Sequence, residues 1–207
     1  SEDSNGVIWI GTFLSGLVSY DLNSGKLTNH DGEPFQKFEL QNGNIRKVIV
    51  DKDDNVWMGT RKGIYRYNQK KNEVVSFNAK IRDLSQGVIA DFIVFALYED
   101  SNNNIWVGTD GYGLFSYSAV EDAFTWHGKD SEIRNMSINS ITQTYDGYFW
   151  LGTDNGLIRY DQTNEGFRVF ESADGLLSKK INRSAFYTER NTLYLGTSEG
   201  INFFDFN

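Results

Sequence analysis

The chain has 207 residues, a formal net charge of −8 and no cysteine, with 39% hydrophobic and 15% aromatic residues. This composition can fill the core of one all-β domain, while the acidic balance argues against a nucleic-acid partner and against docking on anionic lipid. The absence of cysteine excludes a disulfide framework and a thiolate metal site, and no apolar run approaches the roughly 20 residues of a membrane span.

One short phrase, an aromatic residue, an aliphatic residue and then Gly-Thr, recurs along the chain. It occurs at Trp9–Thr12, Trp57–Thr60, Trp106–Thr109, Trp150–Thr153 and Tyr194–Thr197, with spacings of 48, 49, 44 and 44 residues between the aromatic positions. A period in this range, built from strand-forming residues, is typical of the blades of a β-propeller.

Each phrase belongs to a larger unit of four alternating strands, in which it forms the second strand. A polar turn rich in Asn, Asp or Gly precedes the phrase, and a second glycine opens the third strand after it. The predicted first strands are Ile45–Val50, Phe92–Tyr98, Ile138–Tyr145 and Asn182–Thr188, and the predicted fourth strands are Lys26–His30, Val74–Phe77, Phe124–His127 and Phe167–Phe170.

The units cover residues 1–43, 44–90, 91–136, 137–180 and 181–207 of a single propeller segment that spans 1–207. The first unit lacks its first strand and the last lacks its fourth, which leaves about 18 strands, or four and a half four-stranded antiparallel blades. No segment predicts a helix, and Pro34 falls in a connection between units. Because propellers close rings of 4–8 blades, we expect this chain to be part of a larger ring.

The run Asp146–Asp161 resembles the two-component regulator propeller repeat, and all five units are similar to it. The third unit matches well through Asn103–Thr109, whereas the fifth carries Tyr194 in place of tryptophan. The resemblance implies a seven-bladed type of ring in the periplasmic sensor region of a hybrid two-component regulator. Such regions detect oligosaccharides released from polysaccharides and signal across the membrane to a histidine kinase, which lies outside segments of this kind.

The repeated Trp, Gly, Thr and Tyr positions are predicted to be structural, since blade packing needs the same residues each time whereas a ligand contacts only a few blades. His30 and His127 end the fourth strands of units one and three, where units two and four have Phe77 and Phe170. This equivalence favours packing over catalysis for both histidines, and we predict no catalytic residue and no cofactor.

The turn Asp51–Asn55 resembles the start of a calcium loop. However, Val56 stands where such a loop needs glycine, and Lys62 stands where it needs glutamate. The turn also resembles the Asp-box of sialidases, itself a structural turn. We therefore predict a hairpin turn and no metal site.

Residues that depart from the repeat are better candidates for binding. In this topology the turns between second and third strands lie, with the connections between units, on the usual ligand face. Two of these turns are one residue longer, and each adds an aromatic residue that we expect to be exposed. The candidate ligand-binding residues are Phe13, Arg61, Lys62, Asp110, Tyr112, Asp154 and Asn155, and the connections add Phe35, Arg82, Trp126 and Lys179 nearby. An apolar ring beside hydrogen-bonding groups suits a saccharide.

The leading hypothesis is a ligand-sensing module for oligosaccharides. A propeller glycosidase or lyase is the first alternative, although the acids Asp110, Asp154 and Glu199 have no evident pairing. The second alternative is a scaffold for protein partners, and a homodimer is possible in either case.

Overall fold

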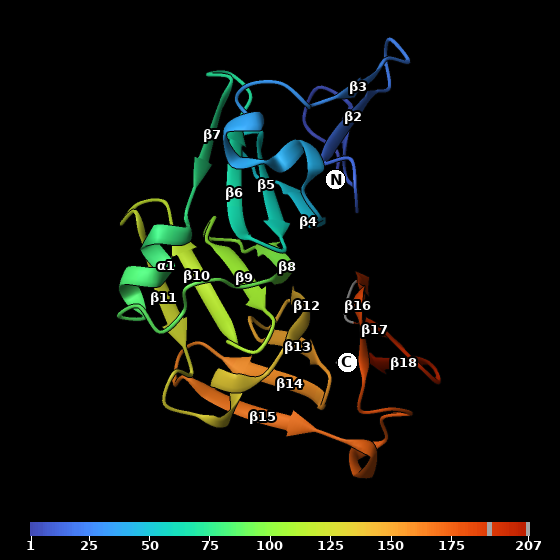
Figure 1. Cartoon of the computed structure of the whole chain (residues 1–207). Helices are drawn as coiled ribbons and strands as arrows, with labels where there is room; N and C mark the ends of the chain where they lie inside the picture. The colour runs from blue at the N-terminus through green and yellow to red at the C-terminus, as the bar shows by residue number, and fades with distance from the viewer. Residues whose placement is uncertain (190–191, 206–207) are drawn as a thin grey trace.

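The computed structural model describes residues 1–189 and 192–205, with the side chains of residues 42 and 184 excepted. This part of the chain contains 18 strands in five antiparallel sheets, which follow one another along an arc from the blue first sheet to the red last one (Figure 1). The prediction of an all-β propeller with about four and a half blades is confirmed.

In every sheet the strands are paired in chain order. The first sheet has β1 (Val7–Gly11), β2 (Leu17–Asp21) and β3 (Leu27–Asn29), and the second has β4 (Ile45–Val50), β5 (Asn55–Thr60), β6 (Gly63–Asn68) and β7 (Glu73–Ser76). The third has β8 (Val94–Glu99), β9 (Ile105–Thr109), β10 (Leu114–Ser118) and β11 (Ala123–His127), and the fourth has β12 (Ile138–Gln143), β13 (Phe149–Thr153), β14 (Gly156–Asp161) and β15 (Gly166–Phe170). The fifth has β16 (Ile181–Glu189), β17 (Thr192–Thr197) and β18 (Gly200–Asp205).

Short helices occupy the connections between sheets. They are α1 (Asn78–Leu84) and the 3-10 helices η1 (Gln36–Phe38), η2 (Leu40–Asn42), η3 (Glu132–Asn135) and η4 (Ser172–Asp174). The expectation of no helix is therefore wrong. The helix α1 is too short for a helical repeat to be visible in the sequence, and it is fixed by tertiary contacts instead, since Ile81 is fully buried. No helix within the described ranges is long and apolar enough to cross a membrane.

The first strands of the sheets, β4, β8, β12 and β16, lie along the inside of the arc and contact one another in sequence (Figure 1). The glycine of the repeated phrase permits this close packing. A Cβ on Gly108 would lie 2.7 Å from the carbonyl oxygen of Ile138 in the next sheet, and one on Gly152 would lie 2.6 Å from Cγ2 of Ile181. Only glycine lets the second strand come so near to the first strand of the following blade.

Three aromatic rings join each blade to the next. Trp106 of β9 stacks on His127 of its own blade at 4.6 Å between ring centroids and packs against Tyr160 of the next blade at 6.0 Å. Equivalent contacts join Trp9 with His30 and Tyr67, Trp57 with Phe77 and Tyr117, and Trp150 with Phe170 and Phe204. The predicted structural role of the repeated Trp and Tyr positions is confirmed.

The polar turn before each phrase anchors the tryptophan. In the third blade, the Asp100 carboxylate accepts backbone N–H bonds from Asn102 (2.8 Å) and Asn104 (2.9 Å) and the indole N–H bond of Trp106 (2.8 Å). Asp3 and Asp51 serve Trp9 and Trp57 in the same way, whereas the fourth blade uses Thr144 for Trp150. The predicted hairpin turn at Asp51–Asn55 is thus confirmed. The Asp51 carboxylate accepts hydrogen bonds from the backbone of the turn and from the indole of Trp57.

The threonine of the phrase closes the next turn. Its hydroxyl donates to the carbonyl of the second glycine in all five blades, for example from Thr109 to Gly113 at 2.8 Å.

The anchor in the third blade can be measured by a double-mutant cycle. We expect Asp100→Asn and Trp106→Phe each to lower the free energy of unfolding. Their coupling should be about 1.5–3 kcal/mol, the range for a hydrogen bond to a charged group. Chemical denaturation measures all four free energies. Asp53→Asn, an exposed carboxylate in the equivalent turn of the second blade, is the control and should change stability by less than about 0.5 kcal/mol. Additivity of the two substitutions would contradict the anchor.

Candidate functional site

A cavity of about 550 Å³ opens between the first two blades, on the face predicted for ligands. The turn from β1 to β2 contributes Phe13 and Leu14, and the turn from β5 to β6 contributes Arg61 and Lys62. Three of the predicted binding residues, Phe13, Arg61 and Lys62, therefore line one cavity.

The connection that holds η1 and η2 forms the remaining wall, with Phe38, Glu39, Leu40, Gln41, Gly43 and Asn44. Glu39 pairs with Lys62 at 2.6 Å, although both side chains are about 70% exposed (71% and 69%). The hydrogen bond and charge of Glu39 raise the pKa of Lys62, but solvent screening leaves such a pair little stabilising value.

The cavity wall contains two buried acceptors without donors. Oε1 of Gln41 and Oδ1 of Asn44 have no hydrogen-bond partner within the described part of the chain. Buried polar atoms normally have partners, so these two oxygens of cavity-lining residues are acceptors whose hydrogen-bonding capacity the described residues leave unused. Phe13, which is 66% exposed, adds an apolar ring at the rim.

Asp110 and Asp154 lie further round the arc, near the inner strands. Asp110 accepts a hydrogen bond from the Ser137 hydroxyl at 2.6 Å, and Asp154 accepts one from the Asn139 amide at 2.9 Å. Neither residue lines the cavity between the first two blades.

Tyr112 and Asn155 have local roles in their turns. Tyr112 is partly buried against the core of the third blade, and its carbonyl accepts the indole N–H bond of Trp126 at 3.0 Å. The expectation of an exposed aromatic ring is therefore wrong at Tyr112, since its ring packs against that core. The Asn155 N–H donates to the Thr153 hydroxyl at 2.9 Å, while its side chain is exposed.

The candidate residues in the connections between units also differ in their burial and contacts. Phe35 is only 3% exposed and packs on Tyr67 at 4.7 Å, so it belongs to the core. Lys179 pairs with Glu171 at 2.7 Å, and Arg82 is exposed on α1.

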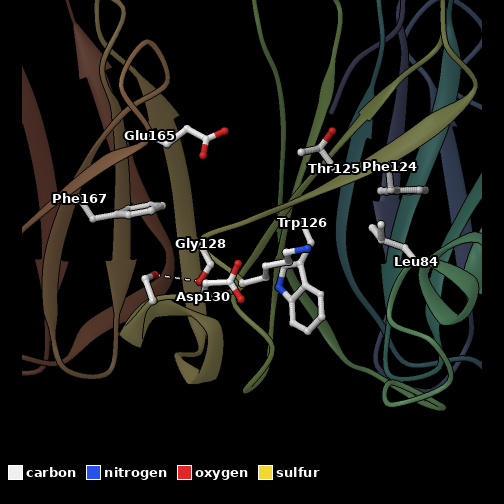
Figure 2. Close-up of a pocket in the computed structure, with 10 residues that line it drawn as sticks. Leu84, Phe124, Thr125, Trp126, Gly128, Asp130, Glu165 and Phe167 are labelled. Atoms are coloured by element: carbon white, nitrogen blue, oxygen red, sulfur yellow. Dashed lines mark hydrogen bonds between the residues drawn. The ribbon is translucent and has the colours of Figure 1, made fainter.

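Trp126 lines a second cavity, of about 560 Å³, between the outer strands of the third and fourth blades. In Figure 2, Glu165 and Phe167 lie on one side of it, and Trp126, Thr125 and Phe124 lie on the other. The ring of Trp126 is held by Phe115, which stacks on it at 5.3 Å. Sequence reasoning missed this cavity because its walls come from strand edges in two different units.

The sequence analysis also missed a set of side chains at the bulges of the inner strands. The pairing of each first strand with its neighbour shifts register at the same point, after Ile45, Val94, Ile138 and Ile181. A β-bulge re-aims a side chain, and the residues at the first three shifts are Arg46, Phe95 and Asn139. The sequence feature that could have indicated these bulges is the break in alternation at Arg46 and Lys47, where two charged residues follow one another within a strand.

At the inner strands, two guanidinium groups lie over the buried ring of Phe95. The Cζ of Arg183 lies 3.6 Å from the ring centroid, and the Cζ of Arg46 lies 5.5 Å from it. Burial lowers the pKa of Arg46, and the charges of Arg183 and Arg61 lower it further, while Asp110 opposes the shift.

The two histidines pack against aromatic rings, His127 buried and His30 partly buried. His127 is 8% exposed, and its ring nitrogens bond the hydroxyls of Ser116 (2.7 Å) and Tyr160 (3.0 Å). Burial lowers its pKa from 6.5 to about 4. His30 likewise bonds Ser19 at 2.9 Å and stacks near Trp9. Both occupy the packing positions predicted for them.

The acids that the sequence places on the loop face lie apart from one another. Asp110 and Asp154 are bonded to different neighbours, and Glu199 lies in the turn before β18. In residues 1–189 and 192–205, no three His, Cys, Asp or Glu side chains gather as metal ligands would.

Successive antiparallel sheets joined through the same ring contacts define a β-propeller repeat protein. Three segments, residues 39–62, 87–111 and 132–155, match the family model for the two component regulator propeller. These three segments thus match the repeat that the sequence resembles.

The chain is similar to a histidine kinase and to the extracellular domain of a putative one component system. The chain is 26% identical over 204 residues to Histidine kinase P4 of Formosa agariphila, covering 97% of this chain and 15% of that protein. The extracellular domain of the putative one component system BT4673 from B. thetaiotaomicron is 27% identical with a TM-score of 0.79, over 95% of this chain and 25% of that one. The chain therefore spans a quarter or less of the length of these relatives.

A propeller enzyme shares the fold. Virginiamycin B lyase from Staphylococcus aureus superposes with a TM-score of 0.69 over 99% of this chain and 68% of the lyase. At 14% identity this likeness concerns the fold alone.

The buried His127 gives a testable pH dependence. Its pKa is about 4 in the fold and about 6.5 in an unfolded chain, so the unfolded state binds the proton more readily. Stability should therefore fall as the pH drops from about 6.5 to about 4, by about 3 kcal/mol from this residue alone. Urea denaturation across this range should show a shallower slope for His127→Phe than for the wild type.

The matched control is His30→Phe, which should keep the component of the slope that comes from His127. Equal slopes for the wild type and His127→Phe would show that His127 takes up its proton as readily in the fold as in the unfolded chain.

Proposed function

We propose that this chain is a ligand-sensing propeller segment in the periplasmic sensor region of a hybrid two-component system, and that its ligand is an oligosaccharide. The matching repeats and the similarity to extracellular domains of such systems support the sensor role. The cavity between the first two blades supports the choice of ligand.

The observation that carries this proposal is the pair of unpartnered acceptors in the cavity wall. Oligosaccharides present rows of hydroxyl donors, and Oε1 of Gln41 and Oδ1 of Asn44 are buried acceptors without donors. The ring of Phe13 offers the apolar face on which a sugar ring packs. A volume of about 550 Å³ lies within the usual range for small-ligand pockets.

The position of the cavity suits signalling. Its walls come from the turn of one blade, the turn of the next blade and the connection between them. A ligand bound there favours the arrangements in which these three segments are close together. Through this difference in affinity, binding shifts the population of sensor conformations. The oligomeric state, including the homodimer expected from the sequence, stays a prediction.

Binding can be tested with a broad panel of oligosaccharides. We expect a cognate member to raise the melting temperature of the protein. We expect Phe13→Ala to weaken binding by about tenfold or more in calorimetry, because the variant loses the buried apolar contact. Tyr145→Ala removes an aromatic side chain that is 94% exposed in the turn from β12 to β13, and it should leave binding unchanged.

Two outcomes would contradict the proposal. One is a panel in which no oligosaccharide shifts the melting temperature. The other is release of new reducing ends or unsaturated products from a bound glycan, which would establish the glycosidase or lyase alternative.

A further inference from the structure

The inner strands gather positive charge at the centre of an acidic protein. The chain has a net charge of −8, yet Arg46 and Lys47 of β4 and Arg183 of β16 all lie at the inner strands, with Arg61 nearby. Ion pairs in the described ranges join Lys62 to Glu39, Lys80 to Asp122 and Lys179 to Glu171, and none includes these four cations. Asp110 is a carboxylate whose charge acts on Arg46, and the four cations outnumber it, which leaves a local excess of positive charge.

The ring of Phe95 positions both arginines, and this stacking does not occupy their N–H donors. Phe95 is 3% exposed, and both guanidinium groups lie over its ring. Stacking on an aromatic ring fixes the plane of a guanidinium while its N–H donors stay available at the edge. The Nε of Arg46 is buried and has no acceptor in the described part of the chain.

The inner strands carry further polar groups. Lys47 and Asn139 line a small cavity of about 40 Å³ between these strands, whose lining includes neither arginine, and burial lowers the pKa of Lys47. Oδ1 of Asn139 is buried and lacks a donor among the described residues. The donors offered to an anion are therefore those of the two arginines over Phe95.

The inner-strand cations interact electrostatically with one residue of the cavity proposed for the oligosaccharide. Arg61 lines that cavity and is also close enough to Arg46 for their charges to interact. A saccharide that lies between the first two blades can therefore extend an acidic substituent toward the inner strands.

We propose that Arg46 and Arg183, stacked over Phe95, bind the carboxylate or sulfate group of an acidic saccharide, so that the sensor recognises uronate-containing or sulfated oligosaccharides. This inference rests on the proposed function and specifies its ligand. Bidentate contacts from arginine suit both planar carboxylate and sulfate oxygens. Phe95 fixes the direction in which the donors point.

Calorimetry with matched ligand pairs tests the inference. One arm uses oligogalacturonates and their carboxyl-reduced counterparts, and the other uses sulfated galactose oligosaccharides and their desulfated forms. We expect an acidic member to bind at least tenfold more tightly than its neutral counterpart, and we expect rising ionic strength to weaken this preference. The arm that shows the preference distinguishes the carboxylate from the sulfate.

Substitutions assign the contact to residues. Arg46→Gln and Arg183→Gln should each weaken binding of the acidic member by about ten- to hundredfold, the loss expected for a charge-assisted hydrogen bond. Arg46→Lys keeps the charge but loses the planar fork, so its effect should be intermediate. Lys71→Gln removes an exposed cation from the turn between β6 and β7 and should have no effect. Melting temperatures without ligand verify that each variant is folded.

The outcomes separate this inference from the proposed function. Equal binding of acidic and neutral members, or acidic binding that survives both arginine substitutions, overturns the anion site and leaves the oligosaccharide sensor intact. Binding of neutral members only has the same consequence. Failure of every acidic and neutral glycan to bind overturns both proposals.

Discussion

The contact on which this architecture depends is the one between a tryptophan and a tyrosine or phenylalanine of the following blade. Trp106 illustrates it, since its indole is fully buried between His127 of its own sheet and Tyr160 of the next. The carboxylate of Asp100 fixes the indole N–H, and Gly108 admits the neighbouring inner strand at a distance that a Cβ would prevent. One phrase of four residues therefore sets the ring contact and the spacing between sheets.

The turns and the bulges lie outside the repeated phrase. The conserved geometry of the phrase holds the blades, while the turns that carry Phe13 and Arg61 differ from blade to blade and reach the cavity. The same principle holds at the inner strands, where Arg46, Phe95 and Asn139 occupy equivalent bulges with different chemistry. The residues of the proposed binding site are thus different from those that hold the blades together.

The sequence predicted the strands well because the phrase and its flanking turns are local signals. The predicted first strand Ile45–Val50 agrees with β4 to the residue, and the roles of His30 and His127 followed from their alignment with Phe77 and Phe170. The helix α1 escaped prediction, since its stability comes from burial of Ile81 against distant strands. For the candidate site, the cavity around Phe13 and Arg61 agreed with the turn argument. The orientation of Tyr112 and the meeting of Arg46 with Arg183 did not follow from spacing, because they depend on how separate blades approach one another.

The bulges have a consequence for variation among the blades. At three of the inner strands one residue lies at a break in the register, and the pairing resumes immediately after it. Phe95 and Asn139 are buried at these positions, and the Asn139 amide donates to the carbonyl of Ile181 in the next sheet. A change of either side chain must therefore suit the adjacent blade, so evolution at the axis is constrained to matched changes in neighbouring repeats.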